Sequence, residues 1–200
     1  FFQRLKDVGV NRISMGCQSF VGEELRQLGR RHTAEDAGRA FRAARNAGFD
    51  NVSLDLMLAI PLQTKESLTR SLQAVAELSP EHLSAYLLKI EEGTPFSRRP
   101  VLPDDDLAAD LYLLTSEFLS CKGYEHYEVS NFARKGFRAK HNSAYWQGRE
   151  YYAFGPGSYG YLCGERFFWE ADLSRFLSGT PRRIIEERLS AEDIRREKRI

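Results

Sequence analysis

Short stretches with a two-residue hydrophobic repeat alternate along the chain with longer stretches that have a helical repeat. In residues 12–18 the odd positions are apolar and the even positions are polar or glycine, and residues 51–58 place Ser53 and Asp55 between valine and leucine residues. Successive side chains of a strand point to opposite faces, so each stretch predicts a strand with one helix-covered face and one polar face. The polar face is unsuited to a packed core and indicates a cavity that receives a ligand.

Capping signals mark the predicted helices. Thr33 followed by Glu35 and Asp36 is typical of a helix N-cap, and the aspartates at 104–106 place carboxylates where a helix dipole favours them. We predict strands at residues 12–18, 51–58, 82–90 and 124–131, and helices at residues 23–29, 33–46, 64–78 and 103–121.

The spacing of these elements fits βα units with right-handed crossovers. Such units form a doubly wound sheet or part of a (β/α) barrel, and no glycine-rich dinucleotide motif follows the first strand. We therefore predict an α/β fold with four adjacent parallel strands in a partial (β/α) barrel over residues 1–135. Residues 136–188 are rich in aromatics and glycines and are predicted to close the barrel or to contact a flat ligand. Residues 189–200 are predicted to begin a small C-terminal domain.

The composition narrows the functional classes. Of 200 residues, 29 are Lys or Arg and 28 are Asp or Glu, and this net charge of +1 disfavours a nucleic-acid partner. No apolar run is long enough to span a bilayer and no signal peptide is recognisable, so we predict a cytoplasmic protein without a transmembrane segment, leaving a peripheral membrane contact open. The three cysteines are far apart and indicate reduced thiols. The chain begins at Phe1, and we interpret it as a fragment.

Several long motifs occur in one order along the chain. They lie at residues 9–20, 54–57, 61–64, 124–133, 141–146 and 155–157. Together they resemble the radical-SAM family of oxygen-independent coproporphyrinogen III oxidases (HemN) and related heme chaperones (HemW), and a set of ordered motifs is more specific than any one of them. The stretch YEVSNFA and the pattern HNxxYW are more similar to the chaperone branch.

The resemblance implies a partial (β/α) barrel that binds a [4Fe-4S] cluster and S-adenosylmethionine. An amide and a carboxylate can hold ribose hydroxyls or the methionyl ammonium, and an arginine can bind the methionyl carboxylate. The residues at matching positions around S-adenosylmethionine are Gln18, Arg30, Asp55, Tyr86, Lys89 and Tyr159.

Structural roles compete with these assignments. The alternative for Asp55 is an ion pair with a loop arginine, and the alternative for Gln18 is a hydrogen bond at a strand end. Lys89 stands where the family usually has a small residue, and Tyr159 stands where it often has a histidine. Any contact with S-adenosylmethionine at these two positions is therefore expected from the backbone.

The resemblance also marks His141 as the candidate heme ligand. Imidazole is a common axial ligand of heme iron, and the aromatic side chains of Tyr145 and Trp146 can flank a porphyrin. A local hydrogen bond is the alternative. The other three histidines, His32, His82 and His126, have no metal-binding spacing and are interpreted as structural.

The family binds its cluster through a CxxxCxxC motif, and this motif is absent from the chain. Cys17, Cys121 and Cys163 are separated by whole βα units and cannot replace it. We therefore assign no catalytic residue and no metal ligand here, and predict that the 200-residue chain alone holds no stoichiometric cluster and is inactive.

Two functions remain open. The first is a heme chaperone that binds heme and passes it to acceptor proteins. The second is an oxidase that abstracts hydrogen from the propionate side chains of coproporphyrinogen III. The HNxxYW pattern favours the chaperone.

Overall fold

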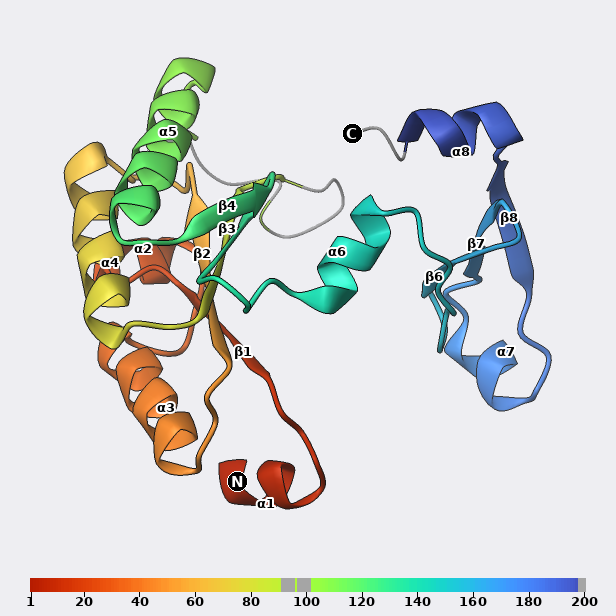
Figure 1. The fold of residues 1–200 in the computed structure, drawn as a ribbon, viewed down its shortest axis with the longest axis horizontal. Helices are drawn as coiled ribbons and strands as arrows, with labels where there is room; N and C mark the ends of the chain where they lie inside the picture. Colours follow the sequence, from red (N-terminus) through yellow and green to blue (C-terminus); the bar gives the residue numbers. More distant parts are fainter. Residues whose placement is uncertain (91–95, 97–101, 198–200) are drawn as a thin grey trace. The chain divides into compact units, whose positions relative to one another are not determined.

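The protein is described by a computed structural model that covers residues 1–90, 96 and 102–197. The chain divides into two compact units, unit 1 (Phe1–Arg138) and unit 2 (Ala139–Ile200) (Figure 1). The helices of unit 1 are α1 (Phe2–Asp7), α2 (Gly22–Gln27), α3 (Ala34–Asn46), α4 (Lys65–Leu78) and α5 (Asp105–Cys121). Its strands are β1 (Ile13–Gln18), β2 (Val52–Leu58), β3 (His82–Leu87), β4 (Glu125–Glu128) and β5 (Asn131–Ala133).

The strands of unit 1 form one sheet in the order β1-β2-β3-β5-β4, in which β1, β2 and β3 are parallel. Figure 1 shows α3, α4 and α5 side by side along this sheet. Their apolar stripes pack on one face of it, where the leucines of β2 and residues such as Phe41, Leu72 and Leu119 are fully or almost fully buried. The predicted α/β fold is confirmed.

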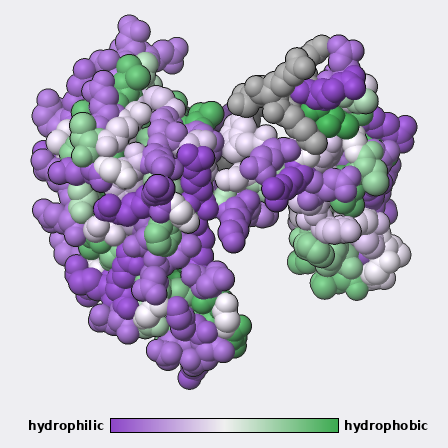
Figure 2. All heavy atoms as spheres, viewed as in Figure 1, coloured by the Kyte–Doolittle hydropathy of each residue, from purple (hydrophilic) through white to green (hydrophobic). Residues whose placement is uncertain are grey.

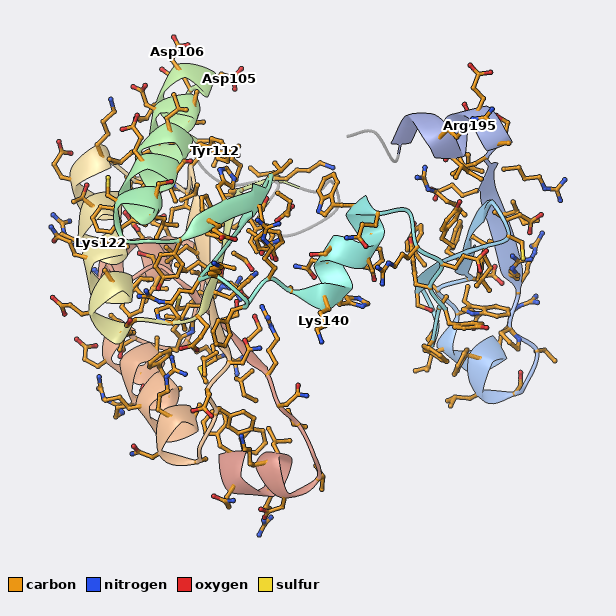
Figure 3. All side chains as sticks on the ribbon, in the orientation of Figure 1. Asp105, Asp106, Tyr112, Lys122, Lys140 and Arg195 are labelled. Carbon is orange, nitrogen blue, oxygen red and sulfur yellow. The ribbon has the colours of Figure 1, made fainter. Side chains whose placement is uncertain are left out.

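The predicted caps are present. Thr33 Oγ1 accepts from the backbone N–H of Asp36, whose carboxylate accepts from the N–H of Thr33, and this reciprocal pair satisfies free donors at the start of α3. Asp104 caps α5 in the same position, and Figure 3 shows Asp105 and Asp106 at the beginning of that helix. Local sequence therefore fixes where these helices begin.

The prediction of one continuous fourth strand at residues 124–131, parallel and adjacent to the third, is wrong: β4 (Glu125–Glu128) runs in the direction of β3, but β5 lies between them. The chain forms two short strands there, and β5 pairs antiparallel with both β3 and β4. Burial explains the difference: residues 131–133 are 4% exposed or less and lie beside β3, whereas the polar residues of β4 form the sheet edge. The third strand ends at Leu87, three residues earlier than predicted.

Unit 2 contains a three-stranded antiparallel sheet of β6 (Tyr159–Leu162), β7 (Glu165–Trp169) and β8 (Arg183–Arg188). Its helices are α6 (Lys140–Trp146), α7 (Leu173–Leu177) and α8 (Ala191–Glu197). The Phe167 ring packs over Gly160 on the neighbouring strand, where an added Cβ would lie 2.5 Å from a ring carbon. Glycine is therefore required at this position.

The predicted boundaries at residues 135 and 188 remain predictions, and residues 198–200 of the last predicted segment lie outside the described residues.

Hydrophilic residues predominate over the outer helices of unit 1 on the face drawn in Figure 2. Within the described ranges, no helix is long and apolar enough to cross a bilayer.

Candidate functional site

The sheet face opposite the helices of unit 1 carries two adjoining rows of mostly polar residues. Residues in register on neighbouring strands share a face. One row is Ser14, Ser53, His82 and Ala133, and the next is Gly16, Asp55, Ser84 and Asn131. Neighbouring strands lie about 4.8 Å apart, so the second row spans about 15 Å and offers polar groups along one line.

Asp55 is the carboxylate of the second row. Ser14 Oγ donates to Asp55 Oδ1 at 3.0 Å, and Ser84 also hydrogen-bonds to this carboxylate. Burial raises the pKa of Asp55, while the two serines and the positive charge of Arg12 act in the opposite direction. The carboxylate is thus half-buried and held in place by hydroxyl donors, with acceptor capacity left for a ligand.

Gln18 ends β1 in a backbone conformation that non-glycine residues rarely adopt. Its φ is +64°, and the N–H of Ser19 donates to the carbonyl of Cys17 at 2.7 Å, which defines a tight three-residue turn. The Gln18 side chain folds back over Gly16, because a Cβ on that glycine would lie 2.5 Å from Gln18 Nε2. Gly16 is the register partner of Asp55, so the turn brings the amide toward the carboxylate.

A buried histidine lies in the first row. His82 Nδ1 lies 2.8 Å from Ser53 Oγ, and His82 Nε2 lies 2.8 Å from the hydroxyl of Tyr127. Burial, together with the charge of Arg12, lowers the pKa of His82 to about 3, so the imidazole is neutral. The guanidinium of Arg12 is anchored by donation to the carbonyl of Phe137 and its pKa is lowered by burial. These hydrogen bonds hold the side chains of the first row in place, which agrees with the interpretation of His82 as a structural residue.

Asn131 ends the second row with an unsatisfied amide oxygen. The residue is 4% exposed, and its Oδ1 is a buried side-chain oxygen that has no hydrogen-bond partner among the described residues. Such atoms are rare because an unmade buried hydrogen bond costs free energy. An unpartnered amide oxygen in line with Asp55 therefore fits a site that is completed by a ligand or by bound water.

A pocket of about 250 Å³ adjoins the polar face at the carboxyl ends of β2 and β3. Met57 lies two residues beyond Asp55 on the same face, and the register pairs it with the half-exposed Tyr86. Arg30 and Lys89, the two cationic residues predicted for the ligand site, both line this pocket. The other lining residues are apolar: Leu28, Met57, Leu88, Ile90 and Phe96. His32 follows the Arg30 loop and lies with Nε2 3.1 Å from the carbonyl of Cys17, which ties that loop to the Gln18 turn.

Two predicted residues lie in unit 2. His141 is the second residue of α6, and its Nε2 lies 2.7 Å from the hydroxyl of Tyr145, with the rings edge-to-face. Tyr159 is half-exposed on β6 and stacks on Phe168. The structure thus groups Gln18, Arg30, Asp55, Tyr86 and Lys89 on unit 1, and His141 and Tyr159 on unit 2.

The cysteines do not fit a cluster site. Cys17 is buried with its thiol 3.0 Å from the carbonyl of Asp55, and burial raises its pKa to about 12, which disfavours the thiolate that binds metal. Cys121 and Cys163 are exposed in different units. In the part of the chain that the structure describes, no three His, Cys, Asp or Glu side chains gather into a metal site.

Sequence reasoning missed two contributors to the polar face. Ser84 and Asn131 join the row only through strand register, and no local pattern marks them. The two-residue alternation placed Arg12 on the polar side of the first strand, and only the structure shows its hydrogen bond to the carbonyl of Phe137.

The sequence and the fold are similar to those of known proteins. Residues 1–75 match the Radical SAM superfamily. The chain is 39% identical to the heme chaperone HemW of Lactococcus lactis subsp. lactis over 93% of its own length and 51% of that protein. It is 44% identical to HemW of Escherichia coli over 76% of its own length and 40% of that protein.

A solved structure, coproporphyrinogen III oxidase (HemN) from Escherichia coli, a radical SAM enzyme, superposes with a TM-score of 0.82 at 23% identity. That superposition covers 98% of this chain and 50% of HemN and shows a shared fold. The chain spans about half the length of the curated relatives it matches. Residues 1–75 are thus similar to the Radical SAM superfamily, the chain has homologues of about 40% identity among the HemW proteins and shares the fold of HemN, and its sequence is closer to HemW.

Proposed function

We propose that this chain is the S-adenosylmethionine-binding part of a heme chaperone of the HemW type. The observation that carries the S-adenosylmethionine site is the polar row, in which the Gln18 amide over Gly16, the Asp55 carboxylate and the unpartnered amide oxygen of Asn131 share one face. The heme part rests on the similarity to HemW proteins and on the HNxxYW pattern at residues 141–146.

The donors and acceptors of unit 1 fit S-adenosylmethionine. Asp55 can accept from ribose hydroxyls or from the methionyl ammonium, and Gln18 can donate and accept beside it. Arg30, from the adjoining pocket, is suited to the methionyl carboxylate. S-adenosylmethionine supplies radical chemistry in this superfamily only together with the iron–sulfur cluster. Because the described cysteines do not fit a cluster, the residues of this chain are assigned to binding and orientation.

Three parallel strands with helices on one face support our proposal that unit 1 is part of a (β/α) barrel whose polar interior holds the ligand. Delivery of heme to acceptor proteins and a cytoplasmic location remain predictions from sequence.

Replacing Gly16 by alanine is expected to weaken binding of S-adenosylhomocysteine about tenfold, because the new methyl group displaces the Gln18 amide, worth about one hydrogen bond. Stability should change little, since the displaced atom is the end of a flexible side chain. Calorimetric titration measures the affinity. Gly22→Ala is the matched control, because a Cβ there meets nothing within 4 Å. Equal affinities for the two variants would remove the Gln18 amide from the site.

Heme titration followed by optical absorption tests the chaperone assignment. We expect one heme per chain, and His141→Ala should lower heme affinity at least about tenfold, the lower range for loss of a metal-site contact. Tyr145→Phe should not weaken heme binding, because it keeps the ring and frees His141 Nε2 from its hydrogen bond. His126→Ala serves as control for removal of an exposed histidine.

Heme affinity that is indifferent to His141 would contradict the assigned ligand. Formation of protoporphyrinogen from coproporphyrinogen III by the cluster-containing protein would favour the oxidase instead.

A further inference from the structure

A buried carboxylate lies next to the predicted site without belonging to the polar row. Glu24 of α2 is 1% exposed. Ser19 Oγ donates to Glu24 Oε2 and Ser67 Oγ donates to Glu24 Oε1, both at 2.5 Å. Burial of a carboxylate is costly unless it is hydrogen-bonded, and these two serines supply the bonds. Ser67 lies in the first turn of α4, where the helix dipole also favours a negative charge.

The same network holds the backbone that follows Gln18. The N–H of Val21 donates to Ser19 Oγ at 2.9 Å, and the N–H of Phe20 donates to Ser71 Oγ at 3.0 Å. Ser71 lies one helical turn beyond Ser67 on α4, with its hydroxyl 3.3 Å from that of Ser19. The hydroxyls of Ser19 and Ser71 each accept a hydrogen bond from a backbone N–H, so each hydroxyl proton must point to a different acceptor. For Ser19 that acceptor is the carboxylate of Glu24.

This anchoring acts on a strained residue. A non-glycine residue with positive φ persists only where the surroundings fix it. For Gln18 those surroundings are the tight turn itself, closed by Ser19, and the attachment of the next residues to α4. The Gln18 amide is folded over Gly16, toward Asp55, only while this turn is kept.

We infer that Glu24 is a positioning residue: through Ser19 it fixes the Gln18 turn and thereby aims the Gln18 amide at the ligand site. For its functional consequence, the inference rests on the proposed S-adenosylmethionine site. Glu24 itself makes no contact with the ligand.

The first test uses the chain without ligand. In ¹⁵N-labelled protein, Glu24→Gln should shift the side-chain amide signal of Gln18 and speed its hydrogen exchange. Glu81→Gln is the matched control, since Glu81 is also a mostly buried carboxylate, which accepts from Arg45 and from the N–H of Val52. The control should leave the Gln18 signal unchanged.

The second test measures affinity for S-adenosylhomocysteine by calorimetry. Glu24→Gln should weaken binding about tenfold, as expected for misplacing one hydrogen-bonding group. In a Gln18→Ala background it should change affinity less than about twofold, because its effect passes through Gln18. A purely structural role would instead give the same loss in both backgrounds. If Glu24→Gln does not fold, Ser19→Ala provides the same comparison and leaves the contact between Glu24 and Ser67 intact.

An unchanged Gln18 signal and unchanged affinity in both variants would overturn the inference. Failure of the wild-type chain to bind S-adenosylhomocysteine would overturn the proposed function. In that case the signal comparison still decides whether Glu24 holds the turn.

Discussion

Asp55→Ala is expected to weaken binding of S-adenosylhomocysteine about 5- to 150-fold, which corresponds to about 1 to 3 kcal/mol for the loss of a charged hydrogen-bond partner. The side chain lies in the middle of the polar row, and two serine hydroxyls hold its carboxylate without using all of its acceptor sites. Calorimetric titration of the wild-type and variant chains measures the difference.

The matched control is Asp110→Ala, which removes an exposed carboxylate of α5 that is paired with Lys65. It should leave the affinity within about twofold of wild type, because exposed ion pairs contribute little. If Asp55→Ala binds as tightly as this control, Asp55 is not a ligand contact and its role is structural.

Acidification should destabilise unit 1 through His82. The folded-state pKa of this imidazole is about 3, against an ordinary value of 6.5, because it is buried and lies near Arg12. Below pH 6.5 the unfolded chain therefore binds a proton that the folded chain does not, and the free energy of unfolding falls as the pH falls. Between pH 6.5 and about pH 4.5 the expected loss is about 2 kcal/mol.

Urea unfolding followed by circular dichroism at several pH values measures this loss. Asp55 opposes the effect, since its raised folded-state pKa favours the folded state in acid. We therefore compare how steeply the free energy of unfolding changes with pH in wild type and in His82→Gln, which lacks the titrating group. His126→Gln is the control for loss of an exposed histidine. Equal slopes for wild type and His82→Gln would show that folding does not lower the pKa of His82.

Local sequence was sufficient for most of unit 1. The reciprocal cap at Thr33, the aspartate cap of α5 and the alternation along β1 and β2 each depend on residues close in sequence, and all are present. The placement of Ser53 and Asp55 on one polar face followed from the same two-residue period.

The region around residues 124–133 shows where local reasoning fails. An eight-residue stretch rich in strand-forming residues predicted one parallel strand, but the chain reverses between Glu128 and Asn131. The deciding factor was which residues are buried next to β3, and the buried Phe132 and Ala133 took that position. Pairing partners distant in sequence set this choice.

The sequence by itself determined the order of strands and helices through the first three βα units, the polar side of the first two strands and the motifs of the radical SAM superfamily, because these depend on near neighbours and on residue identity. Only the tertiary structure decided that Asn131 ends the row of Asp55, that Gln18 folds over Gly16, and that Glu24 joins α2 to α4. Register, a strained turn and burial of a carboxylate arise from contacts between residues up to about 50 positions apart, which no local pattern encodes.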